Sequence, residues 1–150
     1  MTVVNGCELP ENLFYDIPNH IWYVPLADGR IRMGMTSVAI GLADNRIFAF
    51  TPKRPGRDIE KGKSFATIES SKWIGPARSV FDGRVSEAND DLIDRPSLLV
   101  TDPYVAGWMV IAEAVSGDPL AALVTGPTML TAYADWMRDN NFAGCKDDGP

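Results

Sequence analysis

Histidine and cysteine are scarce in this chain, which has one His and two Cys among its 150 residues. The two cysteines, Cys7 and Cys145, lie near opposite ends, so even with His20 they do not complete a four-ligand zinc site. A single imidazole also leaves little scope for a Ser–His–Asp triad, which needs a histidine as its base. Glycine-rich phosphate loops, the HExxH motif and the EF-hand loop are missing from the sequence. These absences argue against a self-sufficient active site.

Positive charge is also in short supply, since 14 Lys and Arg stand against 20 Asp and Glu, for a net charge of −6. That balance disfavours nucleic acid as a partner, because phosphate binding needs clustered cations. No apolar run approaches the ~18–20 residues that span a bilayer. The opening MTVVNGCELPEN lacks the cationic start and the apolar stretch of a signal peptide. We therefore expect a cytoplasmic protein with no membrane insertion and no nucleic-acid partner.

The two cysteines are expected to be free. A structural disulfide between Cys7 and Cys145 is not expected in a reducing cytoplasm. Two thiols on frayed termini are therefore the favoured prediction. A redox role for either thiol is the alternative that the sequence leaves open.

The length, with 45% hydrophobic and 23% charged residues, fits one ordinary globular domain. Thirteen Gly and eleven Pro punctuate short apolar runs throughout the chain, which is typical of many short strands joined by turns. Asp28-Gly29 is a strong hairpin signal because such a turn needs positive φ, and another turn is expected at Asp82-Gly83. The predicted strands cover 21–26, 31–35, 46–51, 64–69, 83–87 and 107–114.

Fewer helices are predicted. Thr36-Ser37 can cap a short helix ending near Leu42, and Asn89 can cap another turn around Leu92. The clearest helix begins at Pro127 and ends near 140–141, and we expect the tail after Gly144 to be polar and mobile. Its apolar residues recur at helical spacing and predict a core or docking face: Met129, Leu130, Tyr133, Trp136 and Met137.

The segment SFATIESSKWIGPARSVFDGRV at 64–85 contains the most suggestive chemistry. A strand ends in ESSK, the chain turns, and a second strand begins beyond Gly83. Lys72 would then stand near a hairpin tip and project into water on a flexible four-carbon stem. Most exposed lysines are merely solvated, so the significance of Lys72 depends on the residues around it.

Those residues resemble the lipoyl carriers, and within them the H-protein of the glycine cleavage system. NHIW at 19–22 is similar to the family's HxW element, and 33–56 resembles its run of GIT, xxA, LGD and LPxxG. ESSK at 69–72 is similar to the ESxK element in which the lysine carries lipoate. Gly83 follows where the family has the glycine of its PVxG turn. NDDLIDRPSLLVTDPYVAGW at 89–108 is close to the family's N, L, P, LIN, DPY and GW series at the same spacing.

The resemblance implies a mainly β fold, a flattened barrel or sandwich of two antiparallel sheets with short helices and a C-terminal helix. It covers about 9–133 of the single domain 1–150, leaving a helical extension and tail over 134–150. It also implies a carrier that catalyses no reaction alone, with lipoate amide-linked to Lys72 as a swinging arm. Glu69 would help a lipoate ligase or lipoyl transferase recognise the hairpin, and Gly83 would supply turn geometry. Dihydrolipoamide dehydrogenase is a further implied partner.

Several residues depart from the glycine cleavage pattern. Bulky Trp73 follows the lysine where that family has small residues, Val80 replaces a proline, and Ala43 replaces the glycine of LGD. These departures resemble the H-protein-like lipoate-binding proteins of the heterodisulfide-reductase-like sulfur-oxidation pathway. That resemblance implies an arm that carries sulfur intermediates between a heterodisulfide-reductase-like complex and sulfur-transfer proteins. A dithiol suits thiol exchange, and Cys7 and Cys145 are candidates to join it.

Other functions stay open. The first alternative is a true glycine cleavage H-protein that carries the aminomethyl group, and the second is an unmodified β-domain that acts as a binding module. A biotin carrier would usually have its lysine between methionines, whereas Ser71 and Trp73 flank Lys72. For Trp73, a role as a cap on the hairpin is preferred over a role as a shield for the arm.

Overall fold

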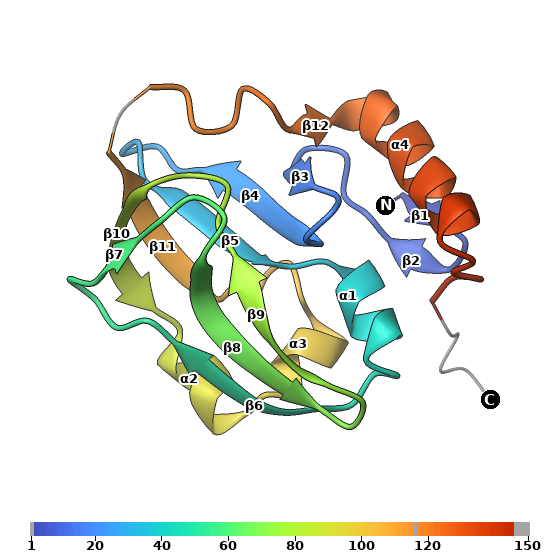
Figure 1. The fold of residues 1–150 in the computed structure, drawn as a ribbon, viewed down its shortest axis with the longest axis horizontal. Helices are drawn as coiled ribbons and strands as arrows, with labels where there is room; N and C mark the ends of the chain where they lie inside the picture. The colour runs from blue at the N-terminus through green and yellow to red at the C-terminus, as the bar shows by residue number, and fades with distance from the viewer. Residues whose placement is uncertain (1, 116, 146–150) are drawn as a thin grey trace.

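The computed structural model describes residues 2–115 and 117–145, and it has the expected mainly β architecture (Figure 1). Seven strands form one sheet in the order β12-β3-β4-β5-β11-β10-β7, three form a second in the order β6-β8-β9, and β1 pairs with β2. The pairings are antiparallel. The strands are β1 (Val3–Val4), β2 (Cys7–Glu8), β3 (Phe14–Asp16), β4 (Ile21–Pro25), β5 (Ile31–Met35), β6 (Ile47–Pro52), β7 (Asp58–Ile59), β8 (Ser64–Ser70), β9 (Ile74–Arg78), β10 (Gly83–Ala88), β11 (Val110–Ala114) and β12 (Val124–Thr125).

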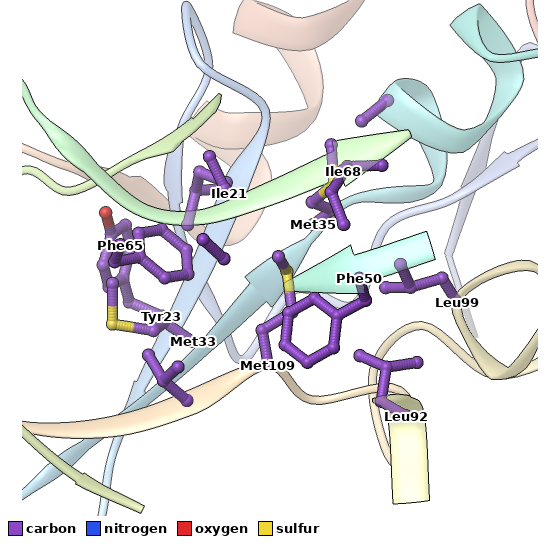
Figure 2. Packing of buried hydrophobic residues seen from close by; sticks show 14 of the residues in the cluster. Ile21, Tyr23, Met33, Met35, Phe50, Phe65, Ile68, Leu92, Leu99 and Met109 are labelled. Carbon is purple, nitrogen blue, oxygen red and sulfur yellow. The ribbon is translucent and has the colours of Figure 1, made fainter. Parts of the chain in front are cut away.

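The two larger sheets enclose the main hydrophobic core. Figure 2 shows Phe65 of β8 beside Tyr23 of β4 and Met33 of β5, and Ile68 of β8 beside Met35 of β5. β5 contributes alternate side chains to this layer, as expected of a strand. β8 also buries the consecutive residues Phe65 and Ala66, where its pairing with β9 shifts in register. The core therefore holds β8, the strand that leads to Lys72, by its inward face.

The predicted Asp28-Gly29 turn is confirmed. Gly29 has a φ of 88°, and the Leu26 amide donates to the Arg30 carbonyl at 2.8 Å, closing the β4–β5 hairpin. Glycine suits this position because it enters the left-handed region without a steric penalty.

The predicted helices are present as α1 (Ser37–Leu42), α2 (Asp90–Asp94) and α4 (Gly126–Asp139), together with α3 (Leu98–Thr101). Thr36 caps α1 through its side chain, as expected. Asn89 instead donates its side-chain amide to the carbonyls of Ala106 and Trp108, so it ties α2 to a loop. None of the helices in the described part of the chain is long and apolar enough to cross a membrane.

The apolar stripe of α4 packs onto a second core that lies outside the sandwich. Met129, Tyr133 and Met137 are buried, while Leu130 and Trp136 pack against the same cluster at its edge. Pro127 lies in the first turn of the helix, where its missing N–H costs nothing. The predicted docking face is therefore confirmed, and it holds α4 beside β1 and β2 (Figure 1).

The prediction of two free thiols is wrong. Cys7 and Cys145 form a disulfide, and Cys7 is fully buried. The two ends of the chain lie side by side, because the Cys145 amide donates to the Asn5 carbonyl at 3.0 Å. The prediction rested on an assumed reducing compartment and on the distance between the two cysteines in the sequence. Neither shows whether the fold brings the chain ends into contact. Cys145 is thus held in place, and the rest of the tail that we expected to be mobile, 146–150, lies outside the described residues.

His20 is buried under α4, with 9% of its surface exposed. Its Nδ1 lies 3.0 Å from the Tyr133 hydroxyl, and its ring meets Trp136 edge-on at 4.4 Å. Burial lowers the pKa of His20 from 6.5 to about 4, because the charged imidazolium loses hydration.

We expect this histidine to make stability fall in mild acid. The unfolded chain binds the proton near pH 6.5 and the native protein only near pH 4. The free energy of unfolding should therefore drop by about 3 kcal/mol as the pH falls through that window. Chemical denaturation of wild type and His20→Asn between pH 4 and 7 tests this, since asparagine tolerates the positive φ of position 20. A difference between the two proteins that stays constant with pH would contradict it.

Candidate functional site

Lys72 lies at the tip of a hairpin, as predicted, but the second strand of that hairpin is β9 and not the strand that begins at Gly83. Glu69 of β8 lies directly opposite Ile74 of β9. Ser70 fixes the turn at its tip. Its amide donates to the Trp73 carbonyl at 2.8 Å, and its hydroxyl accepts from the amides of Lys72 at 3.2 Å and Trp73 at 3.1 Å. Ser71 and Lys72 are thereby held at the end of the hairpin by one serine.

Lys72 projects from this tip with 55% of its side chain exposed. Its Nζ lies 3.1 Å from the Asp44 carboxylate, in the loop between α1 and β6. The Ser71 amide also donates to the Arg46 carbonyl of that loop at 3.3 Å. An ion pair as exposed as this one contributes about 0–1 kcal/mol, so it orients the amine without trapping it. Lys72 stays within reach of another protein.

Asp44 was not among the predicted site residues. It is 28 positions from Lys72 in the sequence, and both Asp44 and Asn45 have positive φ, at 55° and 58°. The only signal available was the LAD sequence at 42–44 that corresponds to the family's LGD. The left-handed turn after α1 brings this loop to the hairpin tip.

Glu69 lies on the outer face of the hairpin strand β8, and its side chain is exposed. Its carboxylate makes no hydrogen bond or ion pair with residues 2–115 or 117–145. The neighbouring Ile68 points the other way, into the core. Glu69 is therefore available to a partner that approaches the outer face.

Trp73 packs down on the hairpin. Its indole is partly buried against the main core. A Cβ added at Gly75 would lie 3.3 Å from that ring, so Gly75 leaves the space that the indole occupies. This packing agrees with the preferred role of Trp73 as a cap on the hairpin.

The structure corrects the expected role of Gly83. It does not form a turn but begins β10, paired with Ala114 of β11 and Ile59 of β7. A Cβ at this position would overlap the Glu113 carbonyl oxygen, so the glycine permits close approach of two backbones. The turn before it is made by Ser79, whose hydroxyl accepts from the Phe81 amide at 3.1 Å.

Gly83→Ala should therefore destabilise the protein by about 2–3 kcal/mol, because backbone atoms of β11 would have to move. Chemical denaturation measures the change, with Ser86→Ala in the same strand as the control. Because Gly83 lies in the strand and not at the hairpin tip, the folded variant should keep its modification rate at Lys72. Unchanged stability in Gly83→Ala would contradict the close-approach explanation.

A cavity of about 650 Å³ lies away from the hairpin tip. It is lined by residues of β3, the turn before β10 and the segment that leads to β12, including Tyr15, Lys61, Phe81, Asp118 and Leu123. Neither Lys72 nor Glu69 lines it. The candidate site is thus the exposed hairpin itself, as expected of a group that is presented to other proteins.

Known proteins are similar to this chain in sequence and in fold. The family model "Glycine cleavage H-protein" matches residues 13–135. "Glycine cleavage system H protein 5" of Aquifex aeolicus is 46% identical over 122 residues, covering 79% of this chain and 80% of that protein. "Probable glycine cleavage system H protein 2" of Sulfurisphaera tokodaii is 37% identical over 148 residues, covering 97% and 99%. The crystal structure of an H protein from Mycobacterium marinum has the same fold, with a TM-score of 0.70, 24% identity and coverage of 89% of this chain and 99% of that one.

Proposed function

This chain belongs to the glycine cleavage H-protein family, and from that premise we propose that it is a lipoyl carrier with lipoate amide-linked to Lys72. The observation that carries the proposal is the position of Lys72, exposed at the tip of a two-stranded hairpin that Ser70 closes. Between Glu69 and Ile74, Lys72 is the one residue that carries an amine. The family acts as a carrier, so no catalytic residue is proposed in this chain.

The residues at the tip fit such an attachment. Lys72 has a flexible stem, a nucleophilic nitrogen and open solvent around more than half of its side chain. When attached, lipoate supplies a dithiolane that can hold a small group at the end of a long arm. Ser70 and Trp73 keep the base of that arm in a fixed turn, while the ion pair with Asp44 is lost once the amide forms and the nitrogen carries no charge. Tethering raises the effective concentration of the carried group at each partner's active site.

For the cargo we propose the aminomethyl group of glycine cleavage. The relatives in Aquifex aeolicus and Sulfurisphaera tokodaii are named for that system. The partners would then be a lipoate ligase or lipoyl transferase, the other cleavage enzymes and dihydrolipoamide dehydrogenase. A cytoplasmic location fits those partners.

The sulfur-carrier hypothesis is the weaker one. The relatives from Aquifex aeolicus and Sulfurisphaera tokodaii are named for glycine cleavage and not for sulfur oxidation. One of its supports is also gone, since Cys7 is buried and bonded to Cys145 and so offers no thiol for a relay. What remains in its favour is Trp73 beside the attachment site, and that indole packs as a cap.

The deciding experiment supplies the lipoylated protein to each partner system separately. With the three other glycine cleavage enzymes, it should support release of CO₂ from glycine, and the unlipoylated protein should not. With the heterodisulfide-reductase-like complex and its sulfur-transfer proteins, we expect no reduction of the arm and no added sulfur mass. A lipoylated protein that is inert in the first assay and loaded in the second would overturn the proposed cargo.

A further inference from the structure

The three-stranded sheet β6-β8-β9, which includes the hairpin, carries two large apolar side chains that are exposed to solvent. Phe48 of β6 is 65% exposed and Ile74 of β9 is 68% exposed. Isolated apolar residues on a surface are ordinary. These two lie in the same three-stranded sheet, at the end that leads to Lys72, and β8 runs between them (Figure 1).

Glu69 stands between the two apolar side chains. Ile74 is directly opposite it on β9, and Ala49 is opposite it on β6. Phe48 precedes Ala49 and is the extra residue of an irregularity where the register shifts between Ile47 and Ala49. Such a bulge redirects a side chain away from the regular alternation. Three neighbouring strands thus expose an apolar, an acidic and an apolar side chain close to the hairpin tip, which we call the hairpin face (Phe48, Glu69 and Ile74).

Packing within the fold does not account for the hairpin face. The inward neighbours Ile47, Phe50 and Ile68 already fill the core beneath it. The Glu69 carboxylate is without an ion pair among the residues that the structure describes. A partner with two apolar recesses on either side of a cation would satisfy all three side chains at once.

Lys72 indicates which partner this is. An enzyme that acts on the far end of an acyl arm works a full arm's length from the hairpin. The enzyme that attaches the arm must instead bring an activated acyl donor, a mixed anhydride or a thioester, to Nζ itself. There the nitrogen forms the amide bond and gives up a proton, while the bond to the donor's leaving group breaks and that group takes the electron pair. This partner therefore has to approach the strands beside Lys72.

We propose that the hairpin face is the docking surface for the enzyme that attaches lipoate to Lys72, with Phe48 and Ile74 as its apolar anchors and Glu69 as its charged contact. This inference rests on the proposed function, because it requires that Lys72 is acylated. It adds the two apolar residues to the recognition that the sequence assigned to Glu69 alone. Phe48 is 24 positions from Lys72 in the sequence and reaches it only through the sheet.

The test measures the rate of lipoylation by intact mass, using the ligase or transferase that loads the wild type. Phe48→Ser with Ile74→Ser should lower kcat/KM at least about tenfold, mainly through KM, since truncating interface anchors costs more than ~1 kcal/mol each. The matched control is Val105→Ser with Val115→Ser. These two apolar side chains lie outside this sheet, and their exposed fractions, 67% and 73%, are close to those of the hairpin-face residues. The control should be loaded at the wild-type rate. Melting temperatures should match in all three proteins.

Two outcomes would overturn the inference. One is a Phe48→Ser, Ile74→Ser variant that is loaded as fast as the wild type. The other is a Val105→Ser, Val115→Ser control that is loaded as slowly as the hairpin-face variant, since the effect would then not belong to this face. A wild type that is never loaded would instead refute the proposed function, so the two failures are distinguishable.

Discussion

Lys72→Arg should leave the protein folded and wholly without lipoate. Arginine keeps the positive charge that faces Asp44 across 3.1 Å, so the hairpin tip should keep its conformation. A guanidinium is always protonated at physiological pH and does not form the amide bond. Intact mass of protein from a lipoate-producing host should show one added lipoyl group on the wild type and none on the variant. Carrier activity should be lost completely, since no other group can substitute for the arm.

The matched control for this experiment is Lys63→Arg. Lys63 is also exposed and lies one residue before β8, at the other end of the strand that leads to the hairpin tip. Its replacement should change neither the mass increment nor the carrier activity. A lipoyl group found on Lys72→Arg, or lost from Lys63→Arg, would show that the attachment site lies elsewhere. An unmodified wild type from such a host would favour the unmodified binding module.

Local sequence was enough to predict the strands that build the core. The predicted ranges of β4, β5, β6, β8 and β10 agree with the structure within a residue or two, because each is a short run rich in apolar residues between turn signals. β9 was missed, since IGPAR contains a glycine and a proline, both rare in strands. Pro76 is tolerated there because β9 is an edge strand, where a missing N–H leaves no ladder unpaired.

Only those residues of the candidate site that are close to one another in the sequence could be predicted. Glu69 and Lys72 occur in one four-residue motif, so the resemblance found them together. Asp44 and Phe48 come from the loop after α1 and from β6, and only the pairing of β6 with β8 brings them to the hairpin. Gly83 was predicted as a turn residue, whereas the structure places it in a strand that closely approaches another strand. Both situations favour glycine, so the residue type alone does not distinguish them.

The disulfide is the clearest case of a contact that sequence alone could not supply. Cys7 and Cys145 are 138 positions apart, and each stands in a segment with little local pattern. The link forms because the α4 stripe docks on the second core and carries the end of the chain back to β2. Gly41 of α1 leaves room for it, since a Cβ there would lie 3.2 Å from the Cys145 sulfur.

Breaking this disulfide should have the largest effect on stability. Closing a loop of 138 residues restricts the unfolded chain, and for that length the entropy model gives up to about 5 kcal/mol at 25 °C. Cys7→Ala with Cys145→Ala should therefore unfold at a markedly lower denaturant concentration than the oxidised wild type. A reductant should lower the stability of the wild type toward that of the variant, and it should leave the stability of the variant unchanged. A wild type that is equally stable with and without reductant would contradict a stapling role.

The same pair of proteins separates a staple from a sulfur relay. A disulfide that only stabilises the fold acts by restricting the unfolded chain. Under conditions where the doubly substituted variant is folded, it should therefore be lipoylated and should transfer its group at the wild-type rate. A relay would need thiols that react during turnover, and the variant would then lose transfer while keeping lipoate on Lys72. Because Cys7 is fully buried, reaction at its sulfur would require the segment after α4 to open first. We therefore expect stability to fall and transfer to persist, with the chemistry confined to the hairpin.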